Sequence, residues 1–302
     1  MSNLNIIINK PIIFCLLLIY IINSFINKKI KKLKVCLCSI GKKENLYVKE
    51  FINHYKKLGY NHIFIYDNND IESERFSDVL MKEIKSGFIS IINYVGFKGK
   101  YNSSQIEAYY DCYERNNRNY NWLSFYDFDE YLELKVQNLT IQEFLNNKRY
   151  QKCVNIKINW VRYQSNEELI YYENNPLQIR FNKSLLNHSS NKHIKSTVRG
   201  GLKKNYWSNS INPHTSLVNY KSCSSSGKSV DSKSPFVEPP DYKYAFIKHF
   251  YTKSFEEFCQ KLKRGWPDIT DNIFLINKII KENKNNKEKL KIIKKIFNFT
   301  TL

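Results

Sequence analysis

The sequence predicts an α/β fold in which a central mixed sheet is flanked by helices, together with an N-terminal membrane helix. Apolar stretches of strand length alternate with longer stretches of helical periodicity between Val35 and Phe128, and an apolar run occupies the N-terminus. With 302 residues, 42% of them hydrophobic, the chain can enclose a sizeable core. We expect a transmembrane signal anchor at 1–27, a basic linker at 28–34, a main domain at 35–270 and a basic helical tail at 271–302.

The N-terminal run is unbroken from Ile12 to Ile22 and continues to Phe25 and Ile26. No small-residue cleavage site follows it, so an uncleaved single-pass anchor is favoured over a cleaved signal peptide. More lysines follow the run than precede it, and the positive-inside rule would therefore place the main domain in the cytosol. A domain facing the Golgi or ER lumen needs the opposite orientation.

The main domain begins with a strand at Val35–Ile40 and a helix at Glu44–Leu58, which carries its apolar residues along one face. Gly59 suits the left-handed position that ends a helix. A second strand at His62–Tyr66 closes in Asp67. Strand, helix and strand with short connections predict a parallel pair joined by a right-handed crossover.

Further elements are predicted at Phe88–Val95 (strand), Ser103–Arg115 (helix) and Trp122–Phe128 (strand). Asp127 and Asp129 stand at the end of the last strand, and alternate strand residues share a face, so we expect both carboxylates to point the same way. Two carboxylates form a hard-oxygen site that suits Mn²⁺ or Mg²⁺ and, through the metal, a diphosphate. The alternative is a polar strand terminus at the surface.

Asp67 lies at the carboxyl end of its strand, where ligands bind in parallel sheets. Its carboxylate could accept hydrogen bonds from ribose or uracil, and the alternative is a helix cap or turn residue. The clustering of acidic residues at carboxyl ends of strands in one sheet favours a ligand site.

Composition narrows the possible partners. Much of the net charge of +20 lies in Lys28–Lys34 and Lys278–Lys295. The second stretch is typical of a basic amphipathic helix, and packing on the domain is favoured over contact with a membrane surface. The remaining charge fits a nucleoside diphosphate or nucleic acid, but no nucleic-acid-binding signature accompanies it, so we expect no nucleic acid. The seven cysteines include no C-x-x-C pair, which argues against zinc. A lumenal domain could hold a disulfide or two, although the sequence indicates no pairing.

Several segments resemble the glycosyltransferase family 2-like and family 92 proteins. Val35–Asp70 resembles the opening of that family, and Ser104–Leu134 resembles the part that leads into its metal-binding aspartates. Later segments are similar to its remaining motifs: His193–Arg199, Pro213–His214 and Lys248–Gly265. The resemblance implies a Rossmann-like fold of the GT-A type, a nucleotide-sugar donor, a divalent metal and, from the location of many such enzymes, a domain in the lumen.

Carried over by position, the resemblance gives Asp127 and Asp129 to the metal and the donor phosphate, and Asp67 to the nucleoside. His249 resembles a late histidine that completes the metal shell, although a buried core histidine is the alternative. Lys195 and Arg199 could hold the leaving diphosphate, with solvated surface as the alternative. The polar stretch Ser208–Ser234 is longer than the family pattern, which predicts a flexible insertion on the acceptor side.

The resulting expectation is a metal-dependent glycosyltransferase that uses a UDP-sugar and a glycan acceptor. Galactose as the sugar rests on the resemblance alone. An inverting reaction would need a carboxylate base, and the sequence leaves several candidates open: Glu130, Glu167, Glu168, Glu173 and Asp268. The alternatives are a membrane-tethered phosphotransferase or nucleotidyltransferase that uses the same aspartates, and a non-catalytic carbohydrate-binding domain.

Overall fold

The computed structural model describes residues 33–95, 104–165, 167–171, 175–203, 214, 220–265 and 272–299. The chain divides into two compact units, Met1–Leu33 and Lys34–Leu302, and nearly all described residues belong to the second. The predicted anchor at 1–27 lies outside the described residues. Among the residues that are described, no helix combines the length and the apolar character needed to cross a bilayer.

A parallel half-sheet forms the N-terminal part of the domain. Strand β1 lies between β2 and β4, with β3 outside β2, and all of these pairs are parallel. The predicted parallel strands are therefore confirmed, and their carboxyl ends meet at one edge. The strands are β1 (Val35–Gly41), β2 (His62–Asp67), β3 (Ile89–Asn93) and β4 (Trp122–Phe125).

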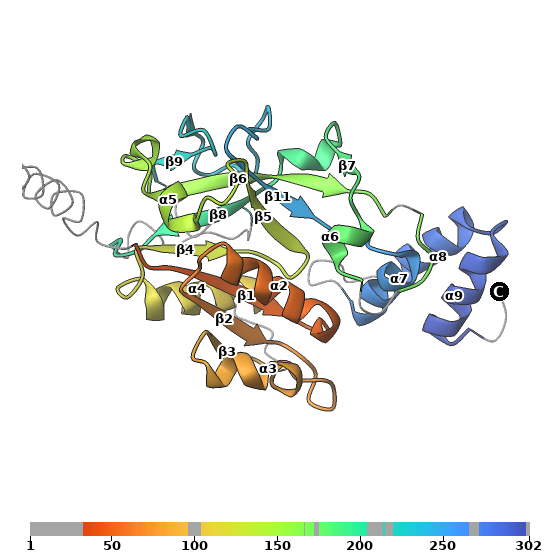
Figure 1. Cartoon of the computed structure of the whole chain (residues 1–302). Helices are drawn as coiled ribbons and strands as arrows, with labels where there is room; N and C mark the ends of the chain where they lie inside the picture. Colours follow the sequence, from red (N-terminus) through yellow and green to blue (C-terminus); the bar gives the residue numbers. More distant parts are fainter. Residues whose placement is uncertain are drawn as a thin grey trace, which may run out of the picture. The chain divides into compact units, whose positions relative to one another are not determined.

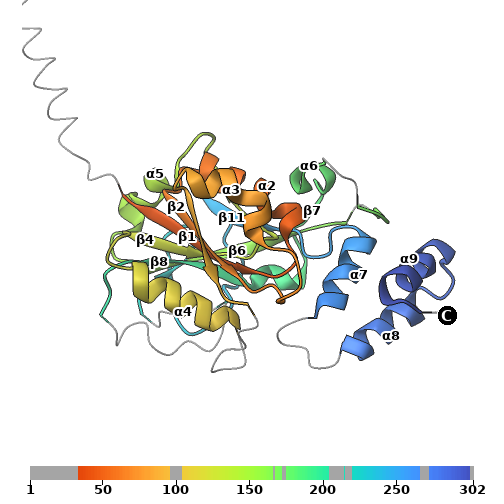
Figure 2. The ribbon, with the colours of Figure 1, turned by 90° about the horizontal axis from the view of Figure 1, so that it is seen from below.

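Helices cover both faces of this half-sheet, with α2 (Asn45–Lys57) and α3 (Phe76–Lys85) on one face and α4 (Ser104–Asn116) on the other (Figure 2). Helix α2 buries a row of side chains spaced four residues apart, Tyr47, Phe51 and Tyr55, which is the spacing of one helical face. Helix α3 is absent from the sequence prediction.

The second half of the sheet is mixed. Strand β8 (Ile194–Arg199) runs antiparallel to β4, and β6 (Asn155–Tyr163) runs antiparallel to β8. Beyond residue 159, β6 instead pairs with β11 (Ala245–His249), which carries β5 (Glu130–Leu134) on its other side. The sheet thus branches at β6 and brings β5 and β11 beside the parallel half (Figure 1).

Short elements complete this half. They are α5 (Ile141–Leu145), η1 (Lys148–Tyr150), α6 (Leu177–Arg180), β7 (Ser184–Leu185), η2 (Ser189–Lys192), β9 (Ser222–Cys223) and β10 (Ser229–Val230).

Two disulfides join distant segments. Cys38 of β1 is bonded to Cys112 of α4, and Cys153 is bonded to Cys223 of β9. The second bond ties the stretch predicted to be a flexible insertion, through Cys223, to the rest of the domain. From residue 220 onward that prediction is wrong, because β9 also pairs with β6 and the buried Lys157 ammonium binds the carbonyls of Asp231, Ser232 and Ser234 at 2.7–3.0 Å.

The C-terminal part contains α7 (Phe255–Arg264), α8 (Asn272–Glu282) and α9 (Lys287–Phe297). Ile293 and Ile296 of α9 are buried against Cys259 of α7. The basic tail is therefore two helices, and α9 packs on the domain as expected.

Candidate functional site

The candidate site lies at the carboxyl edge of the parallel strands. Strand β4 ends at Phe125, so Asp127 and Asp129 lie in the turn that leads into β5, where the Glu130 amide donates to the Asp127 carbonyl. Strand alternation, from which a common direction of the two carboxylates was expected, therefore does not apply to these residues. Each carboxylate is instead held by its own set of partners.

Asp127 is held from three directions. One carboxylate oxygen accepts hydrogen bonds from Gln105 Nε2 at 2.5 Å and Tyr109 Oη at 2.9 Å, both on α4, and the other accepts from Lys195 Nζ at 2.7 Å. Burial favours the neutral acid, but the Lys195 ammonium keeps the pKa of Asp127 below its ordinary value. This carboxylate is thus a fixed anion.

Lys195 is fully buried between acidic groups, which shows that the solvated-surface alternative is wrong for this residue. Its ammonium also lies 3.5 Å from Glu130 Oε2, which accepts a hydrogen bond from the Asp127 amide. Burial raises the pKa of Glu130 well above its ordinary value, which favours the neutral acid. Among the described residues, Glu130 Oε1 has no hydrogen-bond partner.

Asp129 faces the C-terminal part of the chain. Its Oδ2 accepts from Lys261 Nζ of α7 at 2.8 Å, and its Oδ1 lies 3.7 Å from His249 Nε2 at the end of β11. Burial would raise the pKa of Asp129, but Lys261 and His249 hold it well below its ordinary value. Lys261 was not among the predicted site residues, and it lies 132 residues from Asp129 along the chain.

His249 is buried and faces Asp129, and its ring lies 4.1 Å from the Trp160 ring between centroids. Trp160 also contacts the rings of His193 and His214, each at 5.0 Å. Burial lowers the pKa of His249, which favours the neutral imidazole that binds metals. The ring is thus both packed in the core and directed at the carboxylate, so its role as a ligand stays a prediction.

A second buried charge cluster adjoins Asp129. Glu44, which follows β1, accepts from the Arg264 guanidinium, and its Oε2 lies 3.4 Å from Lys253 Nζ. Arg264 and Lys261 occupy the same face of α7. Two cations of the site, Lys261 and Arg264, therefore come from this late helix.

Asp67 is buried at the end of β2, where its oxygens accept from the Asn69 amide, the Asn69 side chain and the Phe76 amide at 2.7–3.2 Å. It therefore has the turn role that was the alternative prediction. It also lines a cavity of about 500 Å³ with Ile71, Arg75, Ser77, Ile91, Asn93 and Val95. A nucleoside role for Asp67 stays a prediction.

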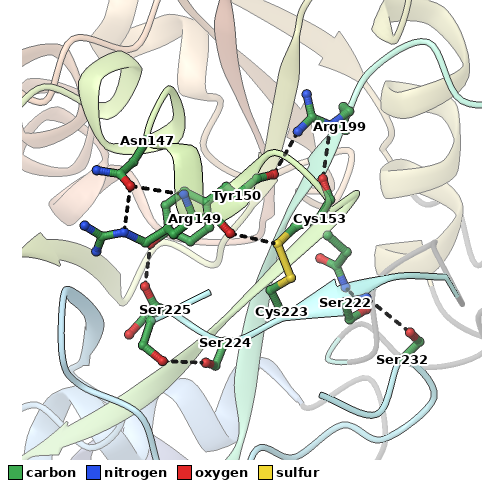
Figure 3. The surroundings of a disulfide bond; sticks show 12 residues. Asn147, Arg149, Tyr150, Cys153, Arg199, Ser222, Cys223, Ser224, Ser225 and Ser232 are labelled. Atoms are coloured by element: carbon green, nitrogen blue, oxygen red, sulfur yellow. Dashed lines mark hydrogen bonds between the residues drawn. A yellow bond between two sulfur atoms is a disulfide. The ribbon is translucent and has the colours of Figure 1, made fainter. Parts of the chain in front are cut away.

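Arg199 is not brought to this cluster. It lies opposite Trp122, the first residue of β4, whereas Lys195 lies beyond the last residue of that strand. Figure 3 shows its guanidinium donating to the carbonyls of Tyr150 and Cys153, at 3.0 and 3.1 Å, beside the Cys153–Cys223 disulfide. These hydrogen bonds give the Arg199 side chain a structural role, away from the two aspartates.

The candidate bases have different surroundings. Glu130 is fully buried, and Glu168 binds Arg180 at 2.9 Å. Glu167 and Glu168 line a cavity of about 470 Å³ with Ser254 and Phe258 of the α7 region. Glu173 and Asp268 lie outside the described residues.

The donor chemistry of Asp127, Asp129 and His249, hard oxygens with one imidazole, suits Mn²⁺ or Mg²⁺. Within the described part of the chain, however, no three histidine, cysteine or acidic side chains form a ready ligand set. Instead, each aspartate accepts a hydrogen bond from a lysine ammonium, Asp127 from Lys195 and Asp129 from Lys261. The chemical types of these side chains therefore suit a divalent cation. A bound cation would have to share the aspartates with the lysines or replace the lysine contacts.

Comparison with known proteins adds the family. The model of glycosyltransferase family 92 matches residues 31–250. A glycosyltransferase family 92 protein of Oryza sativa subsp. japonica is 26% identical over 113 residues, which are 37% of this chain and 18% of the rice protein. The chain thus spans less than a fifth of that relative.

Two crystal structures of S. aureus TarS 1–349, the second in complex with UDP, show only a distant likeness. Their TM-scores are 0.38 and 0.37, at 11% identity over 89% of this chain and 73% of theirs. Similarity at that level does not establish a common fold or ligand. The family match, in contrast, covers most of the 302 residues, and the chain belongs to glycosyltransferase family 92.

Proposed function

We propose that this protein is a GT-A glycosyltransferase that uses Mn²⁺ or Mg²⁺ to transfer a sugar from a UDP-sugar to a glycan acceptor. The observation that carries the proposal is the pair Asp127 and Asp129 at the carboxyl edge of the parallel strands, each with a lysine ammonium against it. Such an edge offers anionic groups to a cation and cationic groups to a diphosphate. Membership of family 92 supports the same reaction class.

The donor would lie along this edge. Asp67 ends β2 and Asp127 follows β4. These strands are separated by β1, so two strand spacings, roughly 10 Å, lie between the two residues. The nucleoside would occupy the cavity beside Asp67, and the diphosphate would reach Asp127, Asp129 and His249 with the metal. Lys195, on β8, would add positive charge beneath the diphosphate.

The bound metal would offset the charge that develops on the diphosphate as its bond to the sugar breaks. We propose an inverting reaction in which an acceptor hydroxyl attacks the anomeric carbon and loses its proton to a carboxylate base. Galactose is the first sugar to test, because the resemblance to family 92 suggests it.

We also propose that residues 1–27 anchor the protein in the membrane, with the domain in the Golgi or ER lumen. The disulfides Cys38–Cys112 and Cys153–Cys223 support the lumen, because disulfides persist in oxidising compartments. They outweigh the lysines that follow the apolar run, which favour the opposite orientation.

The test is protection from thermal unfolding by a panel of nucleotides and UDP-sugars, with and without Mn²⁺. UDP should protect only with Mn²⁺, and a ligand at 100 times its Kd should add about 2.7 kcal/mol to the free energy of unfolding. Product analysis with UDP-galactose and glycan acceptors then tests transfer. Turnover of nucleotide without sugar transfer would support the phosphotransferase alternative, and glycan binding without nucleotide binding would support the non-catalytic one.

A further inference from the structure

Lys261 occupies the place at Asp129 that the proposed metal needs. Its ammonium lies 2.8 Å from Asp129 Oδ2, and the two side chains are only 12% and 8% exposed. Charges in such surroundings are poorly screened, so a divalent cation and an ammonium on the same carboxylate would repel each other strongly. A divalent cation could therefore bind Asp129 only if the Lys261 ammonium moved away.

Lys261 is better placed to move than Lys195. Lys195 is fully buried and is shared by two acidic residues, Asp127 and Glu130. Lys261 extends from α7, and its other hydrogen bond within the described residues is to the Tyr251 carbonyl at 3.3 Å. A lysine ammonium on its four-carbon stem can change partners without movement of the backbone.

We propose that Lys261 is an exchangeable counter-cation: it neutralises Asp129 while no divalent ion is bound, and turns to a phosphate oxygen of the donor once the ion takes Asp129. The inference rests on the proposed function. Asp129 keeps a cationic partner in both states, and so avoids the cost of an unpaired buried charge. The displaced ammonium gains an anionic partner when the diphosphate arrives.

This exchange couples the metal and the donor. A metal that binds alone must displace Lys261 without a new partner for the ammonium, which weakens metal binding. A donor that arrives with the metal supplies that partner, so each ligand should raise the affinity for the other by the same factor. Direct bonds between metal and phosphate add to this coupling, and removal of Lys261 should therefore reduce it without abolishing it.

The test compares K261M with K263M. Both substitutions remove one lysine charge from α7, but Lys263 Nζ binds the Ile296 carbonyl at 2.6 Å and makes no contact with Asp129. Mn²⁺ affinity without nucleotide, measured from the electron paramagnetic resonance of the free ion, should become about tenfold tighter in K261M, because the competing cation is gone. K263M and K261R should match the wild type. UDP affinity at saturating Mn²⁺ should fall in K261M.

Unchanged or weaker Mn²⁺ binding by K261M, relative to K263M, would overturn the exchange and leave Lys261 a structural residue. If K261M is less stable, the rise in Tm on addition of Mn²⁺ still reports the same comparison, since it should exceed that of the wild type. A wild-type protein that binds no Mn²⁺ even with UDP would overturn the proposed metal requirement itself. The two failures can be told apart. Failure of the exchange appears only in the comparison of K261M with K263M, whereas failure of the metal requirement appears already in the wild type.

Discussion

The two aspartates of the site differ in how firmly they are held. Among the described residues, Asp127 accepts three hydrogen bonds from side chains, two of them from α4, whereas Asp129 has one close side-chain partner and an imidazole 3.7 Å away. Asp129 therefore has more capacity for a new ligand. Asp127 is fixed in orientation and suits a hydrogen-bonded or bridging role.

Substitution D129N should abolish Mn²⁺-dependent UDP binding and leave the fold intact, because the amide keeps the size of the side chain and loses its charge. D127N should weaken binding less, since the three surrounding donors still favour an oxygen there. Titration calorimetry with UDP, with and without Mn²⁺, measures both effects. Asp111 of α4, which accepts from Tyr66 and Arg115, provides the control D111N. Equal UDP affinity of the wild type with and without Mn²⁺ would contradict a metal-binding role for the two aspartates.

Substitution H249A should raise the Mn²⁺ concentration needed for UDP binding, because the imidazole that faces Asp129 is lost. The control is H54A, since His54 is also largely buried but binds the Leu132 carbonyl away from the aspartates. H54A should lower the free energy of unfolding by about 1–3 kcal/mol and leave Mn²⁺ affinity unchanged. If H249A shows the same pattern as H54A, His249 is a core residue only.

At the scale of elements, segments with strong local patterns were predictable. The sequence indicates β1, α2, β2 and α4 to within one or two residues, because each has a periodic apolar face and a clear end such as Gly59. Helix α3 was missed because only Phe76 and Leu80 of its residues are buried. The strand predicted at Trp122–Phe128 ends at Phe125, because the aromatic run that predicts it continues into the turn.

The partners of the site were less predictable than its aspartates. Gln105, Tyr109 and Lys261 carry no local signal for a role at Asp127 or Asp129, because those contacts arise only when α4 and α7 pack beside the turn. A single sequence does not specify which side chains of a helix will reach a site formed by residues far away in the chain.

The contact between α2 and β5 should make stability depend on pH. His54 donates to the Leu132 carbonyl, and its pKa is lowered to about 4, mainly because burial disfavours the charged ring. As the pH falls from 6.5 toward 4, the unfolded chain binds a proton that the folded chain does not, so stability decreases. Urea unfolding across this range should show a smaller decrease for H54Q, by roughly 1.4 kcal/mol per pH unit at most. An identical pH dependence for wild type and H54Q would contradict this.

The Cys153–Cys223 bond should stabilise β9 and the turns around it (Figure 3). Substitution C223S should lower the free energy of unfolding by about 2–4 kcal/mol, because the bond restricts the unfolded chain. Hydrogen exchange should rise first at residues 222–234. The free cysteine Cys259 gives the control C259A, whose effect should be centred on α7 and α9. No change in exchange at 222–234 would show that the Lys157 and strand contacts suffice.

At the scale of the whole molecule, Lys34–Leu302 is a compact unit by itself. A protein that begins at Lys34 should therefore fold, remain soluble and bind UDP with Mn²⁺ as well as the full chain does. Size-exclusion chromatography and the thermal protection assay measure both properties. Aggregation of this shorter protein would mean that the first thirty-three residues contribute to the fold.

Helix α7 has a consequence for synthesis of the chain. On its inner face, Glu257 binds Tyr47, Lys261 binds Asp129 and Arg264 binds Glu44, across 210, 132 and 220 residues of sequence. A nascent chain emerging from the ribosome would thus present β1 to β5 long before the cations that neutralise Glu44 and Asp129 exist. Until translation reaches α7, these carboxylates have to remain hydrated. We expect ribosome-stalled chains ending before Phe255 to lack a closed site, and those in which Arg264 has cleared the exit tunnel to acquire one.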